Sequence, residues 1–255
     1  MKKLLLLATL LLCGVSAFCQ GLQWGPWVTE TRENSLSILW VSEEPGMAWV
    51  ELENGTRIWE TFAGRRIFGR LHKIHLEGLK PGAEIRYRVG GENLKDDSNP
   101  RKPKFETGYA YKWRSVKTFD SKAPECRFSV VNDIHLQTDK YSALVSKVNP
   151  ATTDFIFLNG DIATTGNYVL DTLVRYELAP LGELSARLPV MFARGNHEGR
   201  GNNVQLVADI FPTRIPHLSI IPSARAPWPL WCLTAEKPGT TAPFSSAVRP
   251  CMKII

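Results

Sequence analysis

The sequence has few cysteines, no low-complexity segment and no internal repeat. Five cysteines occur in 255 residues, none of them in a C-x-x-C motif, and the three that follow residue 20 are an odd number. Such a set indicates neither a disulfide framework nor a C-x-x-C metal or redox site. A hydrophobic content of 44% is ordinary for a globular protein, and the length allows two modest domains or one large one.

A concentrated basic surface is also absent, although the formal net charge is +6. Lys2 and Lys3 carry two of these charges and residues 214–255 carry four, so residues 20–213 have no net charge. A patch that would attract a polyanion is therefore not indicated, and we expect no nucleic-acid partner.

One apolar run stands out, and it lies at the amino terminus. The basic MKK is followed by LLLLATLLLCGVSA and then by AFC, a small-x-small pattern just before Gln20. This order is typical of an export signal, and the apolar part is short for a membrane span. We interpret residues 1–19 as a signal peptide and expect a periplasmic or secreted protein without a further transmembrane segment. Acylation at Cys19, as in a lipoprotein, is the alternative.

Apolar and polar residues alternate between residues 22 and 108, which is the pattern of half-buried β-strands. The strand candidates are SLSILWV, AWVELEN, HKIHLEGL and AEIRYRVG, and the turn candidates are EEPG, NGT, KPGA and GGEN. Short strands and turns at this spacing predict a β-sandwich. The tryptophans of this region are expected in its core rather than in a sugar-binding platform; they are Trp24, Trp27, Trp40, Trp49 and Trp59.

Histidines and arginines of the same region receive structural interpretations. His72 and His75 are three positions apart on one predicted strand, which places them on opposite faces. We interpret them as surface or strand-edge residues and not as a metal pair. Arg65, Arg66 and Arg70 are interpreted as a solvated face.

The string HKIHLEGLKPGAEIRYRVGG resembles the L-x-x-L-x-P-x-x-x-Y-x-Y-x-V region of fibronectin type III-like modules. SLSILWV resembles the tryptophan-bearing strand of the same modules, so the resemblance covers residues 22–108. It is similar to the N-terminal domain of purple acid phosphatases and their bacterial relatives. The sandwich alone implies no activity, because such sandwiches host many functions.

After a linker at residues 109–125, which can contribute a last strand SVKTF, the pattern changes. RFSVVND, DFIFLNGD and PVMFARGNHE are apolar runs of the kind found in buried parallel strands. KYSALVSKVN, YVLDTLVRYELAPLGELSARL and NVQLVADIF have helical spacing. This alternation predicts a parallel, doubly wound sheet with right-handed crossovers. The predicted fold is therefore an all-β sandwich followed by an α/β domain at residues 126–213.

Each predicted strand of the α/β domain ends in residues with ligand or proton-transfer chemistry. They are Asp133 and His135 after the first strand, Asp161 after the second, and Asn196 and His197 after the third. Because parallel strands place their carboxyl ends at one edge of the sheet, where ligands bind, the three motifs are expected to meet. Gly-Asp alone is common in turns, but three such motifs in order indicate a shared metal site.

These residue types suit a site with two cations. Asp133 and His135 can chelate one cation, and the two oxygens of Asp161 can bridge two. The neutral oxygen of Asn196 suits the second cation, and His197 can protonate a leaving oxygen or stabilise charge on a phosphate. Two cations clamp a phosphate ester and generate a hydroxide nucleophile near neutral pH. Ligands of this kind suit Zn, Fe or Mn.

The series D-x-H, G-D and G-N-H-E resembles that of the calcineurin-like metallophosphoesterases. The resemblance implies an αββα sandwich, two divalent or trivalent metal ions (Fe, Zn or Mn) and a small phosphate ester as substrate. It also implies the roles of the five residues: Asp133 and His135 bind the first metal, Asp161 bridges, Asn196 binds the second metal, and His197 is the catalytic acid. Asp-Ile-His stands where iron-tyrosinate enzymes often have D-x-G, so the chain looks closer to the bacterial calcineurin-like phosphoesterases.

The resemblance stops after the third motif. The family pattern continues with a later histidine and a Gly-His-x-His pair, whereas only His217 follows His197 here. Residues 214–255 hold 7 of the 17 prolines and follow neither a strand nor a helix period. We interpret this segment as an aberrant tail, hypothesise that it is read in a shifted frame, and expect a truncated domain of low activity.

The function that the sequence predicts is that of an exported, metal-dependent phosphoesterase of the acid phosphatase-like class. The alternative is a non-catalytic β-sandwich interaction protein that carries a degenerate phosphatase domain. Metal content and turnover of a phosphate ester distinguish the two.

Overall fold

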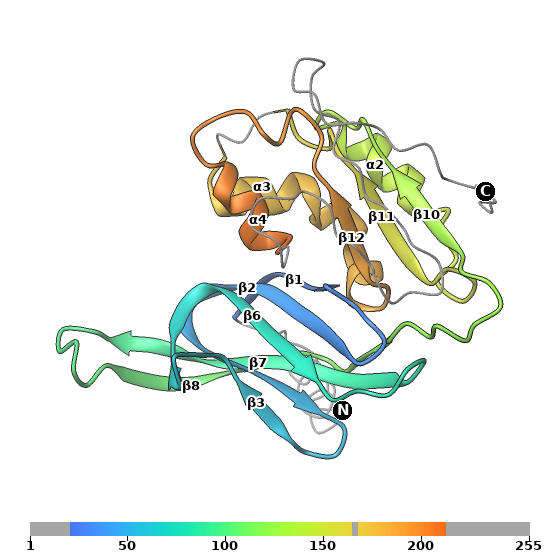
Figure 1. The fold of residues 1–255 in the computed structure, drawn as a ribbon. Helices are drawn as coiled ribbons and strands as arrows, with labels where there is room; N and C mark the ends of the chain where they lie inside the picture. Colours follow the sequence, from blue (N-terminus) through green and yellow to red (C-terminus); the bar gives the residue numbers. More distant parts are fainter. Residues whose placement is uncertain (1–20, 165–167, 213–255) are drawn as a thin grey trace, which may run out of the picture.

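The computed structural model describes residues 21–164 and 168–212, which form a β-sandwich and an α/β domain packed against each other (Figure 1). The expected signal peptide at residues 1–19 and the expected tail at residues 214–255 lie outside the described residues. Among the residues described, no helix has the length and apolar character that a membrane crossing needs.

The first domain is a seven-stranded antiparallel structure. Its strands are β1 (Leu22–Thr29), β2 (Ser35–Leu52), β3 (Arg57–Trp59), β6 (Phe68–Glu77), β7 (Glu84–Asp96), β8 (Lys104–Ala110) and β9 (Arg114–Lys117). The first part of β2 pairs with β1 and β6, and its last part pairs with β3 and β7. Strand β7 pairs further with β8 and β9. The predicted all-β first domain is confirmed.

Strand β2 is continuous where the sequence predicted two strands separated by an EEPG turn. Its register with β6 shifts between Val41 and Gly46, so the EEPG segment is an irregularity within one strand. Pro45 has no N–H for a regular ladder, and bulges tolerate proline. A bulge also bends the strand, which lets β2 take part in both halves of the sandwich. Strand β7 likewise continues through the predicted GGEN turn as far as Asp96.

The tryptophans fill the interior, as the sequence predicted. Trp27 and Trp40 are fully buried, and Trp49 is nearly so. Trp24 and Trp59 are half-buried.

His72 was predicted to be a surface or strand-edge residue; it lies on β6, which pairs only with β2 among the described strands, but the surface position is wrong. His72 is buried, with Nδ1 2.8 Å from Glu60 Oε2 and Nε2 3.1 Å from Ser42 Oγ. These partners satisfy both ring nitrogens, which makes burial possible. His75 is half-buried, and its Nδ1 lies 2.8 Å from Ser37 Oγ.

The second domain contains a three-stranded parallel sheet in the order β10-β11-β12. Its elements are β10 (Phe128–Val131), α2 (Thr138–Val145), β11 (Phe155–Asn159), α3 (Leu170–Glu177), the 3₁₀ helix η1 (Ala179–Ala186), β12 (Val190–Ala193) and α4 (Val204–Ile210). This is the predicted alternation of strands and helices, so the α/β class is confirmed.

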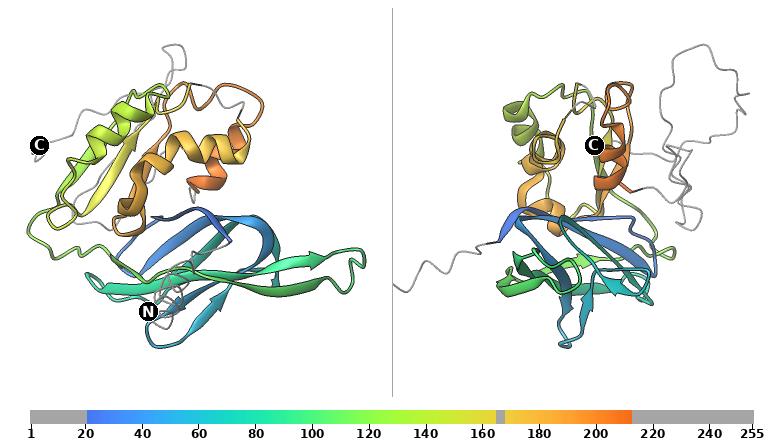
Figure 2. Two further views of the ribbon diagram at one scale, coloured as in Figure 1. Left: turned by 180° about the vertical axis from the view of Figure 1, so that it is seen from behind. Right: turned by 90° about the vertical axis from the view of Figure 1, so that its left-hand side faces the viewer.

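The helices of this domain all pack on one face of the sheet, so the doubly wound arrangement is wrong for the described residues. Residues of α2, α3, η1 and α4 form one buried cluster with Ile156, Leu158 and Val190 of the strands. Figure 2 shows α2, α3 and η1 on the same side. Because the strand order follows the chain, two right-handed crossovers lie on the same face.

The two domains share an apolar core. Trp27 and Leu39 of the sandwich belong to the same buried cluster as the helices of the α/β domain. Trp27 Nε1 donates to the carbonyl of Ile210 at 2.9 Å, and the Tyr87 hydroxyl donates to the carbonyl of Ala186 at 2.8 Å. These buried contacts join the domains into one packed unit.

Charged contacts also cross the boundary. Arg70 makes two hydrogen bonds to Asp171 of α3, at 2.9 and 3.1 Å, so its interpretation as part of a solvated face is wrong. Arg65 and Arg66 are exposed, in agreement with that interpretation. Strand β9, which lies in the expected linker, contributes Arg114, whose guanidinium pairs with Glu183 of η1.

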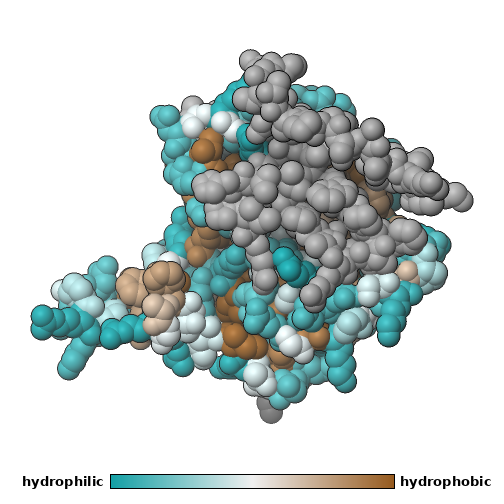
Figure 3. Space-filling view, in the orientation of Figure 1, coloured by the Kyte–Doolittle hydropathy of each residue, from teal (hydrophilic) through white to brown (hydrophobic). Residues whose placement is uncertain are grey.

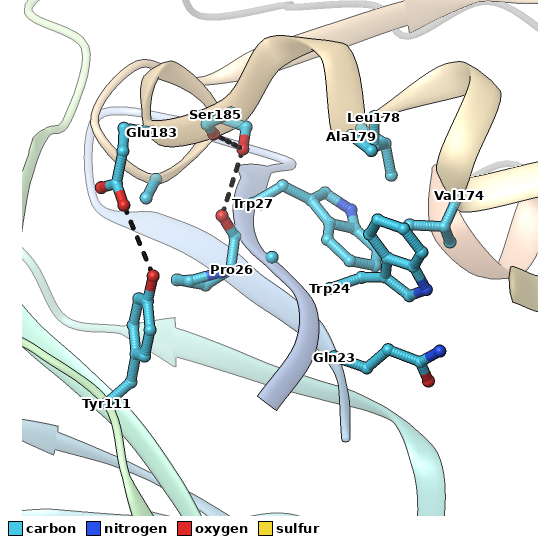
Figure 4. Close-up of a pocket in the computed structure, with 13 residues that line it drawn as sticks. Gln23, Trp24, Pro26, Trp27, Tyr111, Val174, Leu178, Ala179, Glu183 and Ser185 are labelled. Carbon is cyan, nitrogen blue, oxygen red and sulfur yellow. Dashed lines mark hydrogen bonds between the residues drawn. The ribbon is translucent and has the colours of Figure 1, made fainter. Parts of the chain in front are cut away.

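A pocket of about 250 Å³ lies at this boundary (Figure 4). Trp24 and Trp27 of β1 line one side of it, and Val174 and Leu178 line the other. None of the five predicted site residues lines the pocket, so the expected chemistry belongs elsewhere.

Candidate metal centre

The three polar motifs follow the carboxyl ends of β10, β11 and β12 and meet there. Parallel pairing aligns the strands, so their following loops lie at one edge of the sheet. Ligand atoms of His135, Asp161 and His197 all lie within 4.8 Å of one another, and each side chain is partly exposed. Three of the five predicted site residues thus form one cluster that solvent can reach.

Left-handed backbone conformations shape the first two loops. The φ angles are 58° at Asp133, 49° at His135, 65° at Leu136 and 53° at Asp161. Non-glycine residues rarely adopt this region, at a cost of about 1–3 kcal/mol each. Hydrogen bonds hold the loops there: Asp133 N donates to the carbonyl of Gly160 and His135 N to that of Asp161, both at 3.1 Å.

Glu198 ties the second loop to the third. Its carboxylate is fully buried and accepts four backbone N–H groups. Oε2 accepts from Asp161 at 3.0 Å and Gly195 at 2.9 Å, and Oε1 accepts from Ile162 at 2.8 Å and Ala163 at 3.2 Å. Sequence reasoning quoted Glu198 in the third motif but assigned it no role. Its position in the G-N-H-E motif was the feature of the sequence that could have indicated a role.

Glycine is required where the second and third loops touch. A Cβ on Gly160 would lie 2.4 Å from the nitrogen of Gly195, and a Cβ on Gly195 would lie 2.2 Å from Asp161 Oδ1. Any larger residue would therefore push these loops apart. The glycines let Asp161 lie against the third loop.

Hydrogen bonds orient the ring of His197. Its Nδ1 lies 2.9 Å from the carbonyl oxygen of Thr164, which can only accept, so Nδ1 carries a proton. In the neutral ring the lone pair is then on Nε2. The backbone N–H of His197 donates to Asp161 Oδ1 at 2.9 Å, and the ring packs edge-on against His135 with centroids 4.6 Å apart. In this arrangement the lone pair of Nε2 could bind a cation or accept a proton once the Arg200 guanidinium, 3.3 Å away, moves from it.

Asp133 contacts His135 and is not part of the three-residue cluster. Its Oδ1 lies 2.8 Å from His135 Nε2, and its side chain is 67% exposed. Because a carboxylate only accepts, Nε2 carries the proton and Nδ1 keeps the lone pair in the neutral ring. In this arrangement Asp133 orients an imidazole, as carboxylates often do for metal-binding histidines.

Asn196 lies against Asp161, and an arginine lies beyond it. With the amide oriented to satisfy both neighbours, its nitrogen donates to Asp161 Oδ2 at 3.0 Å and its oxygen accepts from Arg200. The Arg200 guanidinium also lies 3.3 Å from both ring nitrogens of His197. Sequence reasoning missed Arg200, although it follows the third motif by two residues. Guanidinium groups bind phosphate oxygens well.

Glu177 of α3 is a second buried carboxyl group near Glu198. It is fully buried, and within the described part of the chain neither carboxyl oxygen has a hydrogen-bond partner. Burial, and next the charge of Glu198, raise the pKa of Glu177 well above its ordinary value. Glu177 is therefore held as a neutral acid at pH values where exposed glutamates are ionised.

The donor set of the cluster fits a metal ion. Two imidazoles and a carboxylate are ligands of Zn and other borderline cations, and three protein ligands with an open side are typical of catalytic sites. We infer from the chemistry of the donors that His135, Asp161 and His197 can hold such an ion.

Residues 126–236 match the family model of the calcineurin-like phosphoesterases. This part of the chain is a calcineurin-like phosphoesterase domain. The resemblance that the three motifs indicated is thereby confirmed for residues 126–236. The match includes all five predicted site residues of the phosphoesterase domain. No curated protein matches the sequence.

Three solved structures have a weak likeness to the chain. The structure of PhoD is 14% identical, with 74% of this chain and 43% of that chain covered and a TM-score of 0.41. The sensor domain of the anti-sigma factor RsgI4 in Pseudobacteroides cellulosolvens is 11% identical, with 41% and 99% covered and a TM-score of 0.26. The Br derivative of BhCBM56 is 12% identical, with 38% and 98% covered and a TM-score of 0.24. The chain thus spans less than half of the PhoD structure, and TM-scores this low carry no functional argument for the phosphoesterase domain.

Proposed function

We propose that the protein is an exported phosphoesterase that hydrolyses small phosphate esters at a dinuclear metal site. The observation that supports this most directly is the cluster of His135, Asp161 and His197 at the carboxyl edge of the sheet, inside a calcineurin-like phosphoesterase domain. Export is proposed from the apolar sequence of residues 1–19. The acid phosphatase-like subtype is proposed from the β-sandwich that precedes the catalytic domain.

Bound cations would polarise the ester and lower the pKa of a bound water molecule. His135 and Asp161 would hold the first cation. Asp161 and Asn196 would hold the second, for which the Asn196 amide would have to turn away from Arg200.

The remaining residues of the centre position groups or carry protons. Asp133 holds the His135 ring through Nε2. His197 is held through Nδ1 by the carbonyl of Thr164, so that a proton on Nε2 can pass to the leaving oxygen. Arg200 would have to turn from His197 and Asn196 towards the oxygens of the ester, where its guanidinium would offset their charge.

Metal content and hydrolysis of p-nitrophenyl phosphate by the purified full chain test the proposal. We expect bound Zn, Fe or Mn and measurable turnover. Asp161→Asn should lower kcat/KM by more than the roughly 10–100-fold that the loss of an orienting partner costs. Asp139→Asn, an exposed aspartate of α2, is the matched control and should change neither property. A folded chain without metal and without turnover would support the non-catalytic alternative.

His197→Ala separates two roles for this residue. If His197 is the acid, the variant keeps its metal and loses about 10²–10⁴-fold in kcat. Loss of metal from the variant would instead show that Nε2 is a ligand.

A further inference from the structure

The hairpin between β3 and β6 is a separate protrusion of the sandwich. Strands β4 (Thr61–Phe62) and β5 (Arg65–Arg66) pair only with each other, as a two-stranded sheet. The two turn residues, Ala63 and Gly64, have φ angles of 50° and 75°, as in a tight type I′ turn. The hairpin therefore has a defined shape and stands apart from the main sheet.

Apolar side chains gather on this protrusion and face solvent. Phe62 is 75% exposed, Phe68 46% and Ile67 38%. Among the described residues seven large apolar side chains are exposed, and these three lie within seven consecutive positions. Phe68 packs edge-on against Phe105 of β8, and Figure 3 shows apolar atoms together at the base of the projecting β7–β8 hairpin. Contiguous exposed apolar surface marks an interaction site.

The charges on the same protrusion are positive and unpaired. Within the part of the chain that the structure describes, neither Arg65 nor Arg66 forms an ion pair, whereas Arg57 and Arg86 on neighbouring strands do. The guanidinium carbon of Arg66 lies over the ring of Trp59, 3.8 Å from its centroid. Residues 61–76 contain no acidic residue. Within the described residues, this surface thus combines exposed apolar side chains with two arginines that form no ion pair.

We propose that Phe62, Arg65, Arg66, Ile67 and Phe68 dock the protein onto an anionic phospholipid surface. Phenylalanine and isoleucine gain free energy by entering the boundary between headgroups and acyl chains. The arginines can bind lipid phosphates at the same depth. A sugar ligand would call for polar aromatic side chains, and the tip at residues 61–68 contains neither Trp nor Tyr. The proposal goes beyond phosphoester hydrolysis, because all five residues belong to the sandwich.

Co-sedimentation of the full chain with phosphatidylcholine vesicles, with and without phosphatidylglycerol, tests the proposal. We expect binding to the anionic vesicles that weakens as salt is added. Because each arginine near an anionic surface contributes about fivefold in affinity, Arg65→Gln with Arg66→Gln should weaken binding roughly 30-fold. Phe62→Ser should weaken it at least about tenfold.

Matched controls come from the α/β domain. Lys140→Gln with Lys147→Gln removes the same charge from exposed positions in and after α2, and Leu144→Ser removes an apolar side chain that is 40% exposed. These variants should keep the binding of the parent within about twofold, since they lie outside the hairpin. Residues 1–19 are the same in every variant, so any contribution from them is common to all comparisons.

Three outcomes would overturn the proposal. They are no preference for anionic vesicles, equal losses in the hairpin and control variants, and binding that depends on the arginines but not on Phe62. The last result, together with retention on immobilised heparin, would identify a soluble polyanion as the partner instead. Turnover of p-nitrophenyl phosphate should be the same in all these variants, so failure of docking is distinguishable from failure of the enzymatic proposal.

Discussion

Glu177 and Glu198 are neighbouring buried carboxyl groups with opposite hydrogen-bonding environments. Four backbone N–H groups point at Glu198, whereas Glu177 has no hydrogen-bond partner within the described residues. A buried carboxyl group without donors is stable only in its neutral form. The ionised Glu198 therefore organises the loops of the metal centre, whereas the neighbouring Glu177 stays protonated.

The raised pKa of Glu177 predicts stability that decreases as the pH rises. Above about pH 4.5 the unfolded chain releases this proton while the folded chain keeps it, so the free energy of unfolding falls by up to about 1.4 kcal/mol per pH unit until the folded pKa is reached. Glu177→Gln, which cannot ionise, should lack this contribution. Urea unfolding at pH 5, 6 and 7 measures it, and a constant difference between the two proteins across that range would contradict the prediction.

Removal of the Glu198 carboxylate is predicted to be severe. Glu198→Ala leaves four backbone donors at the metal centre without their acceptor, and we expect a loss of about 3–5 kcal/mol in the free energy of unfolding. Metal affinity should fall with it, because Asp161 loses its backbone support. Denaturant unfolding and metal titration measure both effects. Glu125→Ala, at a side chain that is 61% exposed, is the control, and a loss below about 1 kcal/mol in Glu198→Ala would show that the loops hold without it.

At the scale of elements, the loops after β11 and β12 can touch because residue 195 is a glycine and has no side chain. Gly195→Ala places a methyl group against Asp161 Oδ1, so we expect metal affinity and kcat/KM to fall roughly 10–100-fold. Gly69→Ala is the matched control, because a Cβ there meets nothing within 4 Å and the residue lies inside strand β6. Parent-like metal binding in Gly195→Ala would mean that the loops can separate without consequence.

Strands β10, β11 and β12 were predictable because each is a short apolar run with Gly, Asn or Asp at its end or within the next two residues. The turns predicted at EEPG and GGEN are not turns, since pairing with β6, β7 and β8 extends the strands through them. Those partner strands are distant in sequence, so the residues of the EEPG and GGEN segments do not predict the pairing. The same limit explains His72, whose burial depends on Ser42 and Glu60.

The candidate site was predictable in its location and only partly in its contacts. Parallel strands bring their carboxyl ends together, which was enough to place His135, Asp161 and His197 near one another. The contact between Asp133 and His135, and the position of Arg200, depend on loop conformations with positive φ and on individual hydrogen bonds. Hydrophobic periodicity carries no information about either.

At the scale of the whole molecule, the shared core predicts that the two domains unfold together. Tyr87→Phe removes the buried hydrogen bond to Ala186 and should lower the free energy of unfolding by about 1 kcal/mol. A single transition is expected by tryptophan fluorescence and by loss of bound metal. Tyr111→Phe is the control, because its hydroxyl contact to Glu183 is longer, at 3.4 Å, and exposed. Two separate transitions would show that the domains are independent.

The backbone of Asp161 has a φ angle of 53°, a left-handed conformation that only glycine adopts without a cost in conformational free energy. Replacement by glycine would release this strain and remove the proposed bridging ligand, and replacement by any other residue would keep the strain. Residue 161 therefore offers no substitution that improves folding and preserves the carboxylate. Substitutions that stabilise the protein must therefore occur at other positions. The backbone strain at Asp161 lowers the free energy of unfolding, and favourable interactions in the rest of the chain offset it.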